Sequence, residues 1–203
     1  GFYQAYELHQ IYHAIYNFCV IELSAFYLDI QKDNLYCNPV NSKERRSCQT
    51  ALYIISRSLV VMLSPILAFS MEDVYRYLPG QKKSSVFMET FPDVIKIPNQ
   101  DDLLKRFESL LAIRVVVNAE LEKKRQTKVI GSSLEASVVV TTPDSITIED
   151  LKKVLVVSKI ILKKGSELSV VVEKSDGEKC LRCWKYDVLT LEGLCRRCEA
   201  VVK

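Results

Sequence analysis

The spacing of apolar residues predicts two long helices in the first third of the chain. One series recurs at alternating intervals of four and three residues: Tyr12, Tyr16, Cys19, Leu23, Phe26 and Ile30. A second series has the same alternation and ends before Pro65: Cys48, Leu52, Ile55, Leu59 and Met62. Because this alternation places side chains on one face of an α-helix, we predict helices over residues 2–31 and 48–62, with the aromatic members in the core.

Two further helices are predicted from capping signals and periodicity. The segment SMEDVYRYLPG offers Ser70 as an N-cap and Asp73 as a capping-box acid, and a Pro-Gly pair stops it. A fourth helix is predicted from Asp102 to Gln126, with Arg114 on its apolar stripe. We expect Arg114 to pair with an acid or to extend its guanidinium toward solvent. Four helices joined by short links favour a bundle.

The pattern changes after residue 128. EASVVVTT, VVSKIIL and LSVVVE are rich in β-branched residues and predict three strands. TIEDLKKVL predicts a short helix with Thr147 as its cap and Asp150 as the capping-box partner. KKGSE predicts a hairpin turn in which Gly165 takes a positive φ, and SDGE predicts a turn at a domain boundary.

These elements together predict a multidomain, mainly α protein. We expect a helical bundle over residues 1–98, a junction helix plus a small α/β unit over residues 99–173, and a cysteine-rich tail over residues 174–203. With 48% hydrophobic and 26% charged residues, the chain can bury a core and is not expected to be disordered. Its longest apolar stretch is interrupted by Ser64 and Pro65 and its first residues resemble no signal peptide, so we expect no membrane helix.

The cysteines are the strongest chemical signal. Seven is an odd number for a disulfide framework, and Cys19, Cys37 and Cys48 are widely separated, as small buried apolar residues would be. The other four form two Cys-x-x-Cys pairs with eleven residues between the pairs: Cys180, Cys183, Cys195 and Cys198. Four thiolates in a tetrahedron suit one structural Zn²⁺; a rubredoxin-like iron and disulfides are the alternatives. This usage indicates a reduced, cytoplasmic protein.

Basic and aromatic residues accompany these cysteines. Arg182 lies inside the first pair, Trp184 follows it, and Arg196 and Arg197 fill the second pair. Guanidinium groups bind phosphates and base edges, and an indole can stack on a base, so RNA contact is one interpretation. The other is that the arginines solvate the knuckle and Trp184 packs on the α/β unit.

A second basic cluster lies near the end of the fourth predicted helix: Lys123, Lys124, Arg125 and Lys128. It could contact phosphates, or it could be a solvated helix end that the helix dipole favours.

Several blocks of the chain resemble the C-terminal part of bacterial isoleucyl-tRNA synthetases. They are YELHQIYHAIYNFCVIELSAFYLDIQKDNLYC, RRSCQTALYIISRSLVVMLSPILAFSMEDVYRYLPG, RVVVNAELEKKRQTKVIGSSLEASVVV and EKCLRCWKY with LCRRC. The resemblance covers essentially the whole chain, with the blocks in the order found in the family. It implies the class Ia anticodon-binding helical bundle, a small α/β unit and a terminal zinc knuckle with four cysteine ligands.

The resemblance also implies a function. The parent enzyme would attach isoleucine to tRNA-Ile using ATP, whereas this fragment lacks the HIGH-type and KMSKS-type ATP signatures and the editing insertion. ATP would bind only at the absent catalytic domain. By resemblance, the metal ligands are Cys180, Cys183, Cys195 and Cys198, and Arg182 and Trp184 contact tRNA. We expect a cytoplasmic monomer whose partner is tRNA-Ile, without a catalytic residue and with no DNA or membrane as partner.

Other functions fit parts of the pattern. A freestanding zinc-knuckle adaptor would bind nucleic acid or protein; one that binds protein predicts an apolar rim around the knuckle and no affinity for tRNA. A DNA-repair glycosylase would need a catalytic amine or acid near its amino end, which the opening GFYQAYE does not offer. Synthetases for valine or leucine share the helical bundle, but the terminal four-cysteine knuckle argues against them.

Overall fold

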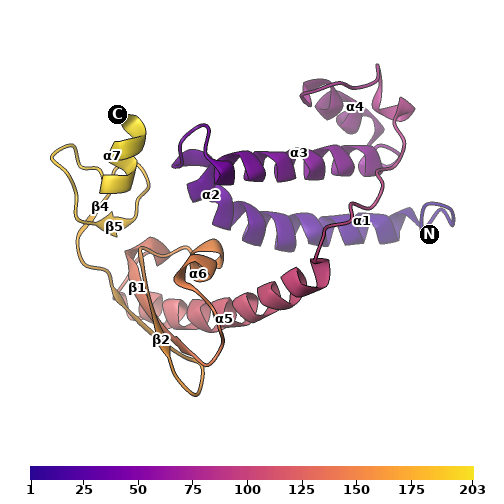
Figure 1. Ribbon diagram of the computed structural model, residues 1–203. Helices are drawn as coiled ribbons and strands as arrows, with labels where there is room; N and C mark the ends of the chain where they lie inside the picture. The colour runs from indigo at the N-terminus through magenta and orange to yellow at the C-terminus, as the bar shows by residue number, and fades with distance from the viewer. The chain divides into compact units, whose positions relative to one another are not determined.

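The computed structural model describes residues 1–203, which form two compact units, Gly1–Lys96 and Ile97–Lys203. The first unit is helical (Figure 1). Its elements are α1 (Leu8–Asn17), η1 (Phe18–Leu28), α2 (Asp29–Tyr36), α3 (Lys43–Leu63), α4 (Ala68–Tyr77) and η2 (Val86–Met88).

The first predicted helix is present but shifted along the chain. α1, η1 and α2 follow one another without a break from Leu8 to Tyr36, and the middle part, η1, has wider π-type turns. The prediction that its aromatic stripe lies in the core is wrong for Tyr12 and Tyr16. Their rings are half exposed and lie against each other, with centroids 5.8 Å apart.

This helical run is also long and apolar enough to cross a membrane. Almost none of its most apolar stretch is buried. Length and composition alone do not separate a membrane span from a helix of a soluble protein, so this finding assigns no membrane.

α3 confirms the second predicted helix. Ser42 caps it by accepting a hydrogen bond from the backbone N–H of Arg45 at 3.2 Å, and the helix ends just before Pro65. The predicted N-cap of α4 is wrong, because α4 begins at Ala68 and Leu67 occupies the N-cap position. The chain enters α4 directly from a backbone turn, so Ser70 is already inside the first helical turn.

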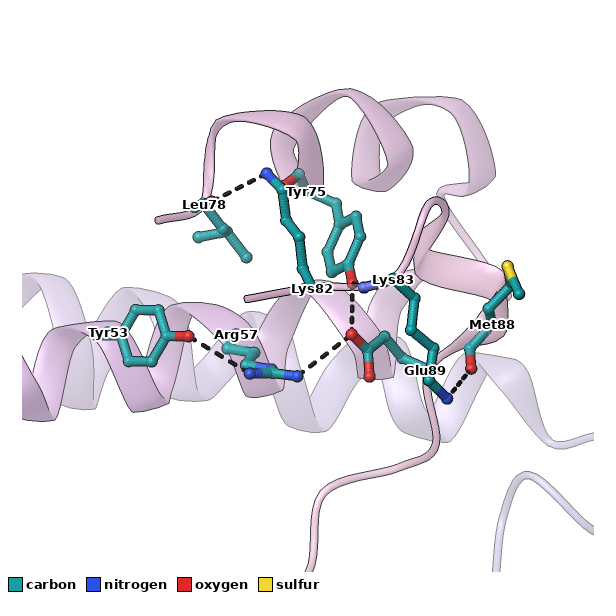
Figure 2. A network of polar contacts seen from close by, with 8 residues as sticks. All are labelled: Tyr53, Arg57, Tyr75, Leu78, Lys82, Lys83, Met88 and Glu89. Atoms are coloured by element: carbon teal, nitrogen blue, oxygen red, sulfur yellow. Dashed lines mark hydrogen bonds and ion pairs between the residues drawn. The ribbon is translucent and has the colours of Figure 1, made fainter. Parts of the chain in front are cut away.

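A small core with a polar network over it joins α3, α4 and η2. Val60, Val61, Tyr75 and Val86 are buried together. The Tyr75 hydroxyl donates to the Glu89 carboxylate, which also accepts from Arg57 Nη2 at 3.2 Å (Figure 2). Burial raises the pKa of Tyr75, and the hydrogen bond from Tyr75 lowers the pKa of Glu89. The network therefore fixes the loop after α4 onto α3.

Lys82 adds a cap to the end of α4. Its ammonium donates to the carbonyl oxygens of Tyr75 at 2.8 Å, Arg76 at 2.5 Å and Leu78 at 2.9 Å. These carbonyls lie at the negative end of the helix dipole, where a cation is stabilising.

The second unit contains one long helix, a three-stranded sheet and a cysteine-rich tail. Its elements before the tail are α5 (Gln100–Gln126), η3 (Ser133–Glu135), β1 (Ala136–Thr142), α6 (Ile148–Val154), β2 (Lys159–Lys164) and β3 (Ser169–Lys174). The sheet order is β2-β1-β3, with β1 parallel to β2 and antiparallel to β3. The three predicted strands, the helix between the first two and the long helix α5 are all confirmed.

The predicted hairpin at KKGSE is wrong. β2 and β3 do not pair, because β1 lies between them. Gly165 does not have a positive φ; a Cβ at this position would lie 2.4 Å from Cγ2 of Thr141. The glycine is therefore explained by close packing against β1 rather than by turn geometry.

One face of the sheet forms the core of this unit. Ala136, Val138, Val140 and Thr142 alternate as the buried positions of β1. α5 contacts β3 and α6, so it packs on the α/β unit. Leu110, Ile113, Val117 and Leu121 are its buried residues.

Two polar contacts fasten α6 to α5. Asp150 forms the predicted capping box with Thr147 and also accepts from Arg106 of α5. The hydrogen bond from Arg106 lowers the pKa of Asp150 well below its usual range. Arg114 donates to the backbone oxygen of Val154, so its guanidinium has a structural role.

Candidate metal centre and nucleic-acid interface

The tail begins as a two-stranded ribbon, β4 (Glu178–Lys179) paired antiparallel with β5 (Tyr186–Asp187). The first Cys-x-x-Cys pair forms the turn between these strands. Trp184 N donates to Cys180 O at 3.0 Å, and Cys180 N donates to Lys185 O at 2.9 Å. Trp184 takes a left-handed backbone conformation (φ 63°), which carries strain for a residue with a side chain and turns the chain back toward β4.

The second pair is held beside the first. Leu189 and Cys195 form an isolated antiparallel bridge, and Cys195 is the N-cap of α7 (Arg196–Val202). Cys180, Cys195 and Cys198 are buried and Cys183 is half-buried. The tail therefore has a small core made of its own cysteines with Leu189 and Leu194.

The four sulfur atoms lie within 4.8 Å of one another. Sγ of Cys183 and Sγ of Cys195 are 3.7 Å apart, and none of the seven cysteines forms a disulfide. Four sulfurs placed 2.3 Å from a central zinc would be about 3.8 Å apart. The four cysteines therefore fit a tetrahedral metal ion, as the sequence predicted.

The backbone favours a thiolate at Cys180. Burial alone would raise the pKa of this thiol, but the backbone N–H groups of Cys183, Cys195 and Arg182 lower it to about 6. Burial raises the pKa of the other three thiols. A preformed thiolate helps to bind a metal cation, because metal binding requires deprotonated ligands. All four tetrahedral positions would come from protein, which makes this a closed, structural type of site.

Of the predicted tRNA-contacting residues, Arg182 and Trp184 lie on the first turn. Arg182 Nη1 lies 3.8 Å from Sγ of Cys198, to which it donates, so its guanidinium faces the sulfur cluster. Trp184 is 59% exposed, and Lys179 Nζ lies 5.1 Å from the centroid of its ring. The exposed indole does not match the interpretation in which Trp184 packs on the α/β unit, and it can stack on another ring.

The remaining predicted residues are also at the surface. Arg196 and Arg197 are exposed in the first turn of α7. Lys128 is exposed just beyond α5 and has a positive φ of 57°. It closes α5 with the hydrogen bonds of a Schellman motif, Lys128 N to Arg125 O at 2.9 Å and Val129 N to Lys124 O at 3.0 Å.

Sequence reasoning missed two features of the tail. Leu181, Val188 and Leu191 are largely or fully exposed apolar side chains of the tail. Their apolar character is visible in the sequence, but their exposure depends on how the turns fold. Ser158 accepts a hydrogen bond from Tyr186 N across 28 residues, and no local pattern signals this contact.

Comparison with known proteins identifies the class. Residues 1–140 match the family described as "Anticodon-binding domain of tRNA ligase", and the chain belongs to this family. Because the match includes α1 to α4, the apolar run from Leu8 to Tyr36 is part of a family domain.

The similar curated proteins are isoleucine–tRNA ligases. The chain is 37% identical to the one from Natranaerobius thermophilus over 99% of the chain, and 42% identical to the one from Methylacidiphilum infernorum over 100% of the chain. It is 42% identical to the one from Dichelobacter nodosus over 97% of the chain. The chain spans about a quarter of the length of these relatives, between 22% and 24%.

Proposed function

We propose that this chain is the tRNA-reading portion of an isoleucine–tRNA ligase, and that it binds the anticodon region of isoleucine tRNA. One observation carries the proposal: the similarity to isoleucine–tRNA ligases extends over 97–100% of the chain, including the cysteine tail beyond the family domain at residues 1–140. Attachment of isoleucine with ATP would be the activity of the whole ligase. This chain would supply binding and no catalytic residue.

The tail supplies the chemistry that such a role needs. An anticodon loop is single-stranded, so its bases can stack on aromatic rings and bond by their edges. Trp184 offers an exposed ring, and Arg196 and Arg197 offer exposed guanidinium groups on the same small tail. We assign these three residues, with Arg182 and Lys128, to tRNA contact. Since Arg182 faces the sulfur cluster, its contact with RNA would use the edge of the guanidinium turned away from Cys198.

The metal in this proposal is one structural Zn²⁺ bound by Cys180, Cys183, Cys195 and Cys198. When bound, zinc would hold the two Cys-x-x-Cys turns together and perform no reaction. The protein would act in the cytoplasm as a monomer, with tRNA and not DNA as its partner. The three-part division into residues 1–98, 99–173 and 174–203 belongs to the same proposal.

A substitution at Trp184 tests the proposal. Trp184→Ala should weaken binding of isoleucine tRNA by about 1–3 kcal/mol, because a base would lose its stacking partner. Filter binding with isoleucine tRNA and a non-cognate tRNA measures this loss. Leu191→Ala is the matched control, since Leu191 is a fully exposed apolar residue of the same tail. Equal affinities for the two tRNAs in the unmodified chain would refute the proposal.

One observation favours a second function. Exposed apolar side chains such as Leu181, Val188 and Leu191 are what a protein-binding zinc-knuckle adaptor would present. An adaptor of this kind has no affinity for tRNA, so the same filter-binding assay separates the two functions.

A further inference from the structure

The ribbon that carries the first Cys-x-x-Cys pair is attached to the α/β unit by hydrogen bonds that meet at one place. That place is the short turn η3, Ser133–Glu135, directly before β1. The strand that enters the ribbon is attached by its backbone: Ser175 N donates to Glu135 O at 2.7 Å, and Ser175 is buried. Two residues later Gly177, with a φ of 94°, lies so close to Asp187 that a Cβ would be 2.5 Å from its carbonyl oxygen.

The strand that leaves the ribbon is attached through a side chain. Tyr186 N donates to Ser158 Oγ at 2.7 Å, and the same hydroxyl donates to Leu134 O in η3. Ser158 itself is fixed, because its backbone N–H donates to Ala136 O at 3.1 Å. A hydroxyl can accept and donate at once, so Ser158 joins two backbone groups that are distant in sequence.

The turn η3 is also bonded to the end of α5. Arg125 Nη2 donates to Ser133 Oγ. The Glu135 carboxylate accepts from Gly131 N and Ser132 N, each at 3.1 Å, which fixes the segment that follows Lys128. The basic end of α5, defined as Lys123, Lys124, Arg125 and Lys128, is therefore joined to the ribbon through η3 and Ser158.

We propose that Ser158 is a positioning residue that holds the knuckle and the basic end of α5 as one RNA-binding surface. This inference rests on the proposed function and adds to it. The knuckle then meets unpaired bases while the basic end of α5 meets phosphates of the same RNA. Two contact sets held in fixed relation bind more tightly than two that move independently, because the second contact costs less entropy.

The experiment uses the full zinc-loaded chain and isoleucine tRNA in filter binding over a series of salt concentrations. Ser158→Ala removes the hydroxyl and leaves Tyr186 N–H and Leu134 C=O without that partner. It should weaken binding about three- to tenfold, the factor that corresponds to the free energy of one hydrogen bond, because the knuckle is then no longer held in a fixed relation to α5. The slope of log affinity against log salt should become shallower by about one phosphate contact. The reason is that the basic end of α5 no longer contacts phosphates at the same time as the knuckle contacts bases.

Two variants and one spectrum separate positioning from folding. Ser158→Thr keeps the hydroxyl and should restore both affinity and salt slope. Ser169→Ala removes an exposed serine of β3 and should change neither. With Co²⁺ in place of zinc, the thiolate charge-transfer band of Ser158→Ala should match that of the unmodified chain, which shows an intact cluster.

Every other outcome counts against the proposal. Unchanged affinity and slope in Ser158→Ala would show that the two surfaces do not act together. Loss of the charge-transfer band would make Ser158 a folding element of the tail, and an equal loss in Ser158→Thr would assign the effect to packing. If the unmodified chain does not prefer isoleucine tRNA over a non-cognate tRNA, the proposed function itself fails. This measurement uses no variant, so it is separate from the test of Ser158.

Discussion

The two units of this protein differ in charge and in chemistry. Gly1–Lys96 carries nine basic and nine acidic side chains, whereas Ile97–Lys203 carries 19 basic and 16 acidic ones, so the whole net charge of +3 belongs to the second unit. The second unit also holds the cysteine cluster and every predicted tRNA-contacting residue. A polyanion would therefore be attracted mainly to the second unit.

The units also differ in how they are held together. The helical unit relies on a small apolar core covered by the network of Tyr75, Glu89 and Arg57 (Figure 2). The second unit has a sheet with one buried face, and its tail has little core beyond the cysteines themselves. We therefore expect the folding of the tail, unlike that of the first unit, to depend on a bound metal ion. Removing the ion tests this difference between the two units.

Removal of the metal should produce the largest difference between the two units. A structural zinc contributes about 10–16 kcal/mol to the folding of a small domain, so chelation should unfold the tail and leave the first unit helical. Trp184 is the only tryptophan, so its emission reports on the tail, while far-UV circular dichroism reports mainly on the helices. Cys198→Ser should reproduce the effect, and Cys19→Ser, outside the cluster, should not. A tail that keeps its emission and protease resistance without metal would contradict this.

The turn at Gly177 should be the next most sensitive position. Gly177→Ala forces a side chain into a left-handed backbone and against Asp187, so we expect the tail to lose about 3 kcal/mol of stability. Gly131→Ala is the milder comparison, because Gly131 has no positive φ and its Cβ would meet only the end of the Glu135 side chain, at 3.1 Å, which has to shift slightly. Thermal unfolding followed by Trp184 emission measures both. Equal decreases in the unfolding temperature of the two variants would argue against the close approach of Gly177 to Asp187.

Acid should weaken the second unit through Asp150. Arg106 lowers the pKa of this carboxyl in the folded state, whereas the unfolded value is about 3.9. The contribution of Asp150 to the free energy of unfolding is therefore present at neutral pH. It is lost as the pH falls below about 4, toward the pKa of Asp150 in the folded state. Asp150→Asn should cost about 2 kcal/mol at pH 7 and progressively less in acid, unlike the exposed Asp144→Asn. Urea unfolding at several pH values checks this, and a cost that does not vary with pH would contradict it.

The smallest effect is expected in the first unit. Tyr75→Phe removes a hydroxyl that donates to Glu89 and accepts from Lys83 N at 3.0 Å, so we expect a loss of about 1 kcal/mol. Tyr77→Phe, on the same helix but exposed, should have no effect. The urea midpoint of far-UV circular dichroism measures both variants. A change in tRNA affinity for Tyr75→Phe would show that the first unit contributes more to binding than its charge indicates.

Local signals in the sequence predicted much of this structure. The capping box of Thr147 and Asp150, the end of α3 before Pro65 and the bounds of α5 are as expected. Each depends on residues a few positions apart, whose geometry the backbone imposes. The convergence of four cysteines also followed from spacing, since each Cys-x-x-Cys turn directs two sulfurs to one point.

The errors came from contacts between distant residues. The hairpin at Gly165 was wrong because β1 takes the place between β2 and β3, and the side chain of Thr141 then requires the glycine. Tyr12 and Tyr16 share the periodicity of a buried stripe, yet periodicity defines a face of a helix and not what covers it.

The sequence by itself determined the types of the main elements and the convergence of the four cysteines, because periodicity, capping and ligand spacing act over short stretches of chain. Only the tertiary structure decided the strand order, the position of α5 on the sheet and the attachment of the knuckle through Ser158. These features join segments separated by tens of residues. Packing and hydrogen bonding between such segments select one arrangement from several that the local pattern would allow equally well.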